Sequence, residues 1–94
     1  MIRSFANKET ERIWRRERSR KLPSEPQLVM LRKLRQLNRI ARPADLRVPP
    51  GNRFEELKGA RKGTYSIRVN DQWRITFRWH DGGAYDVRIE DYHR

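Results

Sequence analysis

Cysteine is absent from this chain of 94 residues, and histidine occurs only at His80 and His93. The first absence excludes disulfide bonds and thiolate catalysis, and it fits a reducing compartment. Two histidines do not suffice for a histidine-rich metal site, so we expect neither a metal nor another cofactor. No apolar run approaches the roughly 18 residues of a membrane-spanning helix, and residues 1–8 lack the apolar stretch of a signal peptide. The sequence therefore predicts a cytoplasmic protein without a membrane segment.

Acidic residues are scarce beside basic ones. The chain has 23 Lys and Arg against 12 Asp and Glu, which gives a net charge of +11 and an isoelectric point of about 11.2. This excess is larger than solubility requires, and it indicates a polyanionic partner. Nucleic acid fits well, because every neutralised phosphate releases condensed counterions. The length allows one compact domain, 1–94, and excludes a second.

The first half of the chain predicts a short strand and two helices. Residues 2–5 form the strand, and Asn7 caps a helix that is expected to reach about Arg20. This helix has few apolar residues and exposes a basic face. Residues 24–27 match a capping box for a second helix, which Pro43 ends. The apolar face of the second helix consists of Met30, Leu34, Leu37 and Ala41, widened by Leu31 and Ile40.

The period of the apolar residues changes to two in the second half. Alternation over 65–69, 73–79 and 85–89 predicts three strands, and short turns at 70–71 and 81–83 join them as antiparallel neighbours. The apolar face of this sheet needs the two helices as cover, which predicts a two-layer α+β domain. The other face suits a phosphate backbone, since it presents Arg68, Arg74, Arg78 and Arg88.

Aromatic residues occupy the same alternating positions as the apolar residues of these strands. Tyr65, Trp73 and Trp79 are expected to be core residues rather than platforms on which bases stack. Tyr85 continues the same phase in the last strand. His80 lies beside a turn, where solvent is its expected environment.

Four motifs in the second half occur together and in order. They are a Leu-Lys-Gly turn at 57–59, a Gly-x-Tyr-Ser-Ile-Arg-Val strand at 63–69, a Trp-Arg-Ile-Thr-Phe strand at 73–77 and an Asp-Tyr-His end at 91–93. With the opening residues 1–5, this set resembles the HigB family of toxins in the RelE/ParE superfamily. The resemblance implies a RelE-like fold with a short N-terminal strand, two helices and a small antiparallel sheet packed on the helices.

The same resemblance implies a function and partners. A HigB-type protein is expected to be the toxin of a type II toxin–antitoxin system, a ribosome-dependent endoribonuclease that cleaves messenger RNA in the ribosomal A site. Such cleavage inhibits translation and arrests growth. The expected partners are a helix-turn-helix antitoxin of the HigA type, the bacterial ribosome and its messenger RNA. The toxin is expected to be a monomer when free and part of a hetero-oligomer with its antitoxin.

Metal-independent cleavage of RNA needs a base for the 2′-hydroxyl proton, cations for the developing phosphorane charge and an acid for the leaving 5′-oxygen. The resemblance implies that Asp91, Tyr92 and His93 form the catalytic cluster and that Arg74 binds the scissile phosphate. Lys58 is a candidate for a second cation. Some relatives carry a catalytic histidine where this chain has a glutamate two residues before Leu57. We therefore expect Glu55 to act as a base or to orient His93.

A separate set of basic residues suggests a grip on RNA. Five cations fall within residues 15–21, which is more than a solvated helix needs. We expect this helix and one basic pair to contact ribosomal RNA, while the polar face of the sheet holds the messenger. The residues assigned to RNA binding are Arg15, Arg16, Arg18, Arg61, Lys62 and Arg68.

Two other functions fit part of the sequence. A ParE-like inhibitor of DNA gyrase would have the same fold without nuclease residues. A plain nucleic-acid-binding module would explain the charge, but the chain shows no zinc-ligand set or RNA-recognition aromatic motif. The Asp-Tyr-His end at 91–93, together with Arg74, favours the nuclease.

Overall fold

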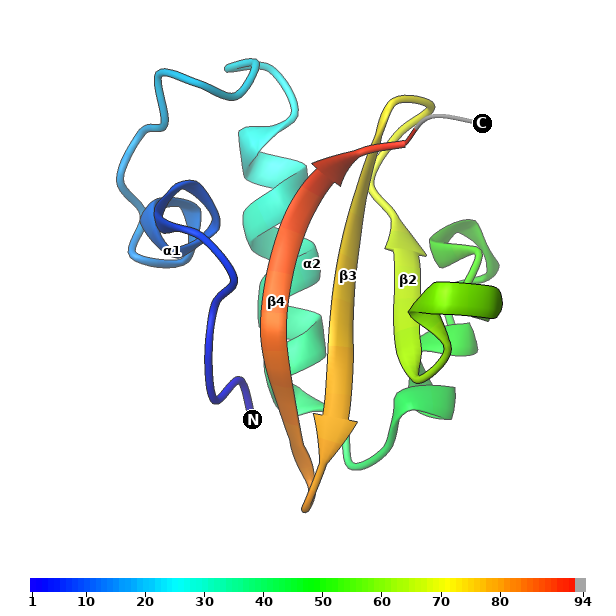
Figure 1. Cartoon of the computed structure of the whole chain (residues 1–94). Coiled ribbons are helices and arrows are strands. Elements are labelled where there is room, and N and C mark those ends of the chain that lie inside the picture. Colours follow the sequence, from blue (N-terminus) through cyan, green and yellow to red (C-terminus); the bar gives the residue numbers. More distant parts are fainter. Residues whose placement is uncertain (93–94) are drawn as a thin grey trace.

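A four-stranded antiparallel sheet forms one layer of the molecule (Figure 1). The computed structural model describes residues 1–92, and neighbours along the chain are neighbours in the sheet. The strands are β1 (Glu55–Glu56), β2 (Thr64–Arg68), β3 (Trp73–His80) and β4 (Gly83–Asp91). The last three are the predicted meander. The short edge strand β1 is an addition that the apolar pattern did not indicate.

Two helices, α1 (Lys8–Trp14) and α2 (Gln27–Arg39), form the other layer, and α2 lies behind β3 and β4 in Figure 1. The side chains that are fully buried between the layers include Met30, Leu34, Leu37, Ile67, Ile75, Phe77 and Val87. Each of them contributes about 1.5–3 kcal/mol by leaving water. The predicted two-layer α+β fold is confirmed. Within residues 1–92, every helix falls short of the length and apolarity that crossing a bilayer requires.

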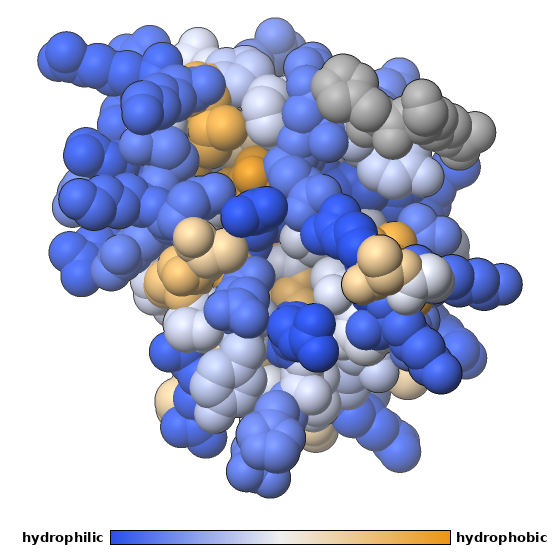
Figure 2. Space-filling model, in the orientation of Figure 1, coloured by the Kyte–Doolittle hydropathy of each residue, from blue (hydrophilic) through white to orange (hydrophobic). Residues whose placement is uncertain are grey.

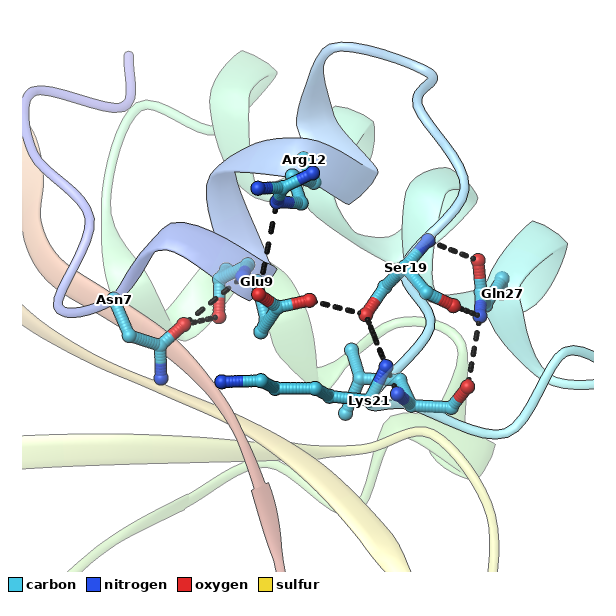
Figure 3. Close-up of polar contacts among 8 residues, drawn as sticks. Asn7, Glu9, Arg12, Ser19, Lys21 and Gln27 are labelled. Carbon is cyan, nitrogen blue, oxygen red and sulfur yellow. Dashed lines mark hydrogen bonds and ion pairs between the residues drawn. The ribbon is translucent and has the colours of Figure 1, made fainter.

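The first helix is shorter than predicted. It ends at Trp14, and Arg16 has a left-handed backbone with φ 64°, so the prediction of a helix to Arg20 is wrong. Residues 15–26 form a loop instead. Ser19 anchors this loop, because its buried hydroxyl donates to Glu9 and its backbone carbonyl accepts a hydrogen bond from Gln27 (Figure 3). These polar contacts replace the helical hydrogen bonds that a longer helix would make.

The start of α2 also differs from the prediction. The residue before the helix is Pro26, which makes no side-chain cap, so residues 24–27 do not form a capping box. The Gln27 side chain instead donates to the backbone carbonyls of the preceding loop, at Ser19, Leu22 and Pro23. The helix therefore begins where its first side chain ties down the loop (Figure 3).

The end of α2 lies four residues before Pro43. Ile40 has an extended backbone with ψ 150°, and Pro43 opens a short 3-10 helix, η1 (Pro43–Arg47). Ala41 was predicted on the apolar face and is exposed, because the helix has already ended there. The Asp45 carboxylate accepts hydrogen bonds from the backbone N–H groups of Ala41 and Arg42, which fixes this connection.

The predicted N-terminal strand is present only as two isolated bridges. Ile2 pairs with Ala84 and Phe5 pairs with Val87, both parallel to β4. The N-terminal segment thus covers the edge of β4 without becoming a full strand.

A β-bulge changes the side-chain phase within β4. Asp86 has φ 52°, and the register between β3 and β4 shifts between Thr76 and Arg78. As a result Ala84 is buried opposite Trp79, while Tyr85 lies opposite Arg78 on the polar face. The prediction of Tyr85 as a core residue is therefore wrong, whereas the other strand aromatics, Tyr65, Trp73 and Trp79, pack against the core as expected.

Candidate active site

The helices leave one face of the sheet open. Figure 2 shows this face in the orientation of Figure 1, and hydrophilic side chains cover most of it. The register places polar and charged residues in two adjacent rows across β2, β3 and β4, namely Ser66, Thr76 and Arg88 in one row and Arg68, Arg74 and Glu90 in the other. Side chains of both signs therefore meet on the open face.

Arg74 occupies the middle of its row and is only 8% exposed. Its guanidinium donates to the Ser66 hydroxyl at 3.3 Å and lies 3.7 Å from the Glu55 carboxylate. The ring of Tyr92 covers it, with 4.2 Å between the guanidinium carbon and the ring centre. Such a cation–π contact contributes about 0.5–2 kcal/mol. The hydrogen bond, the ion pair and the ring contact together hold the guanidinium in one orientation at the sheet surface.

Glu55 reaches Arg74 because of the short strand β1. Its pairing with Ser66 places the carboxylate on the open face beside the guanidinium. The side chain is 47% exposed, so it can meet a ligand that lies on the sheet. The structure thus brings together the predicted phosphate ligand and the predicted base.

The end of β4 separates two of the three residues that were predicted as a cluster. Tyr92 lies against Arg74, and its backbone N–H donates to the Gln72 carbonyl at 2.6 Å. Asp91 pairs with Trp73 in the register, on the phase opposite to Arg74, and accepts a hydrogen bond from the Gln72 side chain at 3.2 Å. The third predicted residue, His93, lies outside the described residues.

Arg61 makes a contact that was not predicted. Its guanidinium donates to both carboxylate oxygens of Glu90, at 2.7 and 2.9 Å, and Thr76 donates to the same carboxylate at 2.7 Å. The hydrogen bond from Arg61 lowers the pKa of Glu90 below its ordinary value of 4.5, with the Thr76 hydroxyl and Arg88 acting in the same direction against desolvation. Sequence reasoning overlooked Glu90, although strand alternation places it on the polar face opposite Arg74.

This ion pair ties a turn across the sheet. Lys58 and Lys62 flank the 3-10 helix η3 (Gly59–Arg61) between β1 and β2, and both lysines are exposed. Because Arg61 reaches Glu90 on β4, the turn is held over the open face. The structure thereby fixes the backbone that carries both lysines.

The basic residues of the N-terminal region lie elsewhere. Arg15 forms an ion pair with Glu11 at 2.8 Å, and Arg16 and Arg18 are exposed in the loop 15–26. This loop lies beside α1, which packs on β4, whereas Glu55 lies on the opposite edge strand (Figure 1). The fold does not bring these arginines to Arg74. Over residues 1–92, no group of three or more Asp, Glu or His side chains is arranged to hold a metal ion.

Known sequences resemble nearly the whole chain. Residues 3–93 match the family described as the RelE-like toxin HigB of type II toxin–antitoxin systems. The toxin HigB-1 of Vibrio cholerae is 42% identical over 91 residues, which are 96% of each chain. A protein named endoribonuclease HigB from Proteus vulgaris is 49% identical over 41 residues, which are 44% of this chain and 45% of that protein.

Solved structures share the fold. YafQ from Escherichia coli superposes with a TM-score of 0.58 at 15% identity, over 97% of this chain and 93% of that one. The YoeB/ParE toxin from Agrobacterium tumefaciens gives a TM-score of 0.53 at 19% identity, over 96% and 99% of the two chains. A type II toxin has an antitoxin protein as its partner. The family match over 3–93 and the near full-length identity to a HigB toxin show that this chain belongs to the HigB family of RelE-like toxins.

Proposed function

We propose that this HigB toxin is an endoribonuclease that cleaves messenger RNA on the ribosome without a metal ion. The observation that carries the proposal is the fixed guanidinium of Arg74, which lies between the Glu55 carboxylate and the Tyr92 ring on the open face. A phosphodiester on this face would meet a cation, a carboxylate and an aromatic side chain within one site. The name of the Proteus vulgaris relative supports the same activity.

The chemistry follows from these groups. Glu55 accepts the proton of the 2′-hydroxyl, and the 2′-oxygen attacks the neighbouring phosphorus. Arg74 stabilises the negative charge that develops on the phosphorane oxygens. The bond to the 5′-oxygen breaks, and an acid from the residues 91–93 protonates that oxygen. The products are a 2′,3′-cyclic phosphate and a 5′-hydroxyl.

Residues 91–93 have different roles in this proposal. Tyr92 contacts Arg74 and positions it, while His93 is the group that we assign to protonating the leaving oxygen. Asp91 lies on the other phase of β4, where it orients the chain end through Gln72.

The remaining basic residues bind RNA in this proposal. Lys58 is the second cation for the phosphorane charge, and Lys62 contacts ribosomal RNA from the same turn, which Arg61 holds through Glu90. Arg68 contacts the messenger from β2. The loop residues Arg15, Arg16 and Arg18 contact ribosomal RNA.

We further propose a setting for this activity. The toxin is a cytoplasmic monomer that acts in the ribosomal A site. It is neutralised in a hetero-oligomer with a helix-turn-helix antitoxin of the HigA type. The cytoplasmic ribosome is the place where a toxin of charge +11 meets a dense array of phosphates.

The test replaces Arg74 by lysine, which keeps the charge but loses the planar fork and the ring contact. Purified ribosomes translate a defined messenger in the presence of the toxin, and 5′ ends are mapped with only the magnesium that ribosomes need. Arg74→Lys should lower the cleavage rate about 10²-fold or more. The matched control, Arg35→Lys on the exposed side of α2, should cleave at the wild-type rate.

Other outcomes would contradict the proposal. Equal rates for Arg74→Lys and Arg35→Lys would remove Arg74 from the reaction. Inhibition of DNA gyrase with an intact messenger would favour the ParE-like function.

A further inference from the structure

A cavity of about 260 Å³ opens beside Arg74 at the end of the sheet where β2 finishes and β3 begins. Three arginines contribute to its wall. The lining residues are Arg53, Arg68, Asn70, Asp71, Arg74 and Tyr92. Arg53 has no part in the mechanism described so far, and its presence here makes the cavity a second place where an anion could bind.

Positive charges outnumber negative ones in this wall, where three arginines lie with one carboxylate, that of Asp71. Arg68 lies directly opposite Arg74 in the register, and like charges in that position destabilise a sheet. Arg68 also helps to lower the pKa of Lys33, after the larger effect of burial and the effect of Arg32. Among the lining residues the acidic side chain is Asp71, which pairs with Arg68 but is 100% exposed. An ion pair with so exposed a partner is weak, so a ligand phosphate can compete for Arg68.

Arg53 is held in a backbone conformation that arginine rarely adopts. Its φ of 45° and ψ of 51° lie in the left-handed region, where a Cβ atom is unfavourable and glycine is at ease. The strain is maintained by the preceding residue, Asn52, which is fully buried. Asn52 donates to the Leu46 carbonyl at 3.1 Å and accepts a hydrogen bond from Lys33. Functional positions often have a strained backbone that the surrounding structure holds in place. Arg53 fits this description, and its charged side chain lines the cavity.

We propose that Arg53 and Arg68 form a second phosphate subsite, which binds the phosphodiester next to the scissile one held by Arg74. Guanidinium groups match phosphate by paired hydrogen bonds, and the cavity adjoins the open face along which an RNA strand would run. The inference rests on the proposed function in that the ligand is taken to be RNA. Its consequence is that the strain at Arg53 serves RNA binding and not stability.

The test measures binding of a short single-stranded RNA whose 2′-oxygens are methylated, so that cleavage is prevented. Arg53→Gly removes the charge and suits the left-handed backbone. We expect its affinity to fall about tenfold and its salt dependence to lose a slope of about 0.7, which corresponds to one phosphate contact. Its melting temperature should equal or exceed that of the wild type.

Three further variants sharpen the comparison. Arg53→Lys keeps the charge but loses the planar guanidinium, so its salt slope should match that of the wild type while its affinity falls between those of the wild type and Arg53→Gly. Asp71→Asn should bind RNA a few times more tightly, since it releases Arg68. Arg35→Gln, which removes one charge from the exposed side of α2, should leave the affinity within about twofold of the wild type.

The outcomes separate this inference from the proposed function. If Arg53→Gly and Arg35→Gln bind RNA alike and with equal salt slopes, the subsite is overturned, even if the wild type cleaves messenger on ribosomes. If Arg53→Gly loses affinity while the wild type shows no cleavage, the subsite stands and the nuclease proposal fails. If Arg53→Gly melts below the wild type, Arg53→Lys separates a structural role from RNA binding. The subsite stands if Arg53→Lys has the same low melting temperature and still binds RNA. Otherwise the role of Arg53 is structural.

Discussion

At the scale of single residues, Arg74 shows how a charged side chain is stabilised where water has little access to it. A buried guanidinium is costly unless its hydrogen bonds and its charge are satisfied. Ser66, Glu55 and the Tyr92 ring supply those contacts from three different strands or strand ends. The guanidinium is therefore oriented before any substrate arrives, which is the condition for electrostatic stabilisation of a transition state.

A prediction at this scale concerns Glu55. Replacing it by glutamine removes the proposed base while keeping the size of the side chain, so the cleavage rate on ribosomes should fall between 10²- and 10⁴-fold. Binding of the methylated RNA should not weaken, because the change removes a negative charge beside Arg74. Glu56→Gln is the matched control, because Glu56 is the neighbouring residue of β1 and pairs with Tyr65 on the other phase. Equal loss of cleavage in both variants would remove Glu55 from the base role.

Sequence reasoning placed some site residues and not others. Alternation in β3 put Arg74 on the polar face, and the resemblance connected it to Tyr92. Arg53 could not be identified, because its role depends on a left-handed backbone after a buried asparagine. The pair of Arg61 with Glu90 joins residues 29 positions apart, and no local pattern reports such a contact.

At the scale of elements, the loop 15–26 depends on one buried hydroxyl. Ser19 donates to Glu9 and accepts hydrogen bonds from the backbone N–H groups of Lys21 and Leu22 (Figure 3). Ser19→Ala removes these hydrogen bonds, so the free energy of unfolding should fall by about 1–3 kcal/mol in urea denaturation. Ser24→Ala changes an exposed serine of the same loop and should have little effect. If the two variants unfold at the same urea concentration, Ser19 is not the anchor.

The turn between β1 and β2 gives a prediction about pH. Glu90 has a pKa below 4.5 in the folded protein because Arg61 donates to it, so the folded state binds a proton less readily than the unfolded chain. The stabilisation is therefore present above the unfolded pKa and is lost as the pH falls through the folded value.

Glu90→Gln lacks this titration. Its loss of stability from pH 5 to pH 3, followed by urea denaturation, should be smaller than that of the wild type. Glu56→Gln, which changes an exposed glutamate of β1, is the control and should lose as much stability between these pH values as the wild type. Parallel acid profiles for Glu90→Gln and the wild type would contradict the role of the ion pair with Arg61.

Periodicity predicted which helices and strands form more accurately than it predicted where they end. The apolar face of α2 and the three long strands follow from spacing alone, because burial selects every third or fourth residue in a helix and every second in a strand. The end of α1 depends on Ser19, which donates to the Glu9 side chain ten residues earlier, and on Gln27, which donates to the Ser19 carbonyl eight residues earlier. The phase change at Tyr85 depends on a bulge at Asp86, and such a bulge leaves no clear mark in the pattern.

At the scale of the whole molecule, basic residues lie on the open face of the sheet and also far from it. The open face of the sheet, which is largely hydrophilic (Figure 2), carries Arg74 and its neighbours, and the loop 15–26 carries exposed arginines. In the proposed function, the open face holds the messenger and the arginines of the loop contact ribosomal RNA, as a net charge of +11 allows. The antitoxin partner that a type II toxin requires must neutralise such a molecule in the cell.

The chemistry of the RNA ends tests the central claim most directly. The toxin is freed of metal ions with chelator and added to ribosomes stalled on a defined messenger at the magnesium level that keeps them intact, and the new termini are identified by their reactivity with kinase and phosphatase. Attack by the 2′-oxygen, with Glu55 as base and Arg74 on the phosphorane, predicts a 5′-hydroxyl and a 2′,3′-cyclic phosphate. A 5′-phosphate with a 3′-hydroxyl, or loss of cleavage in toxin that has been treated with chelator, would contradict it.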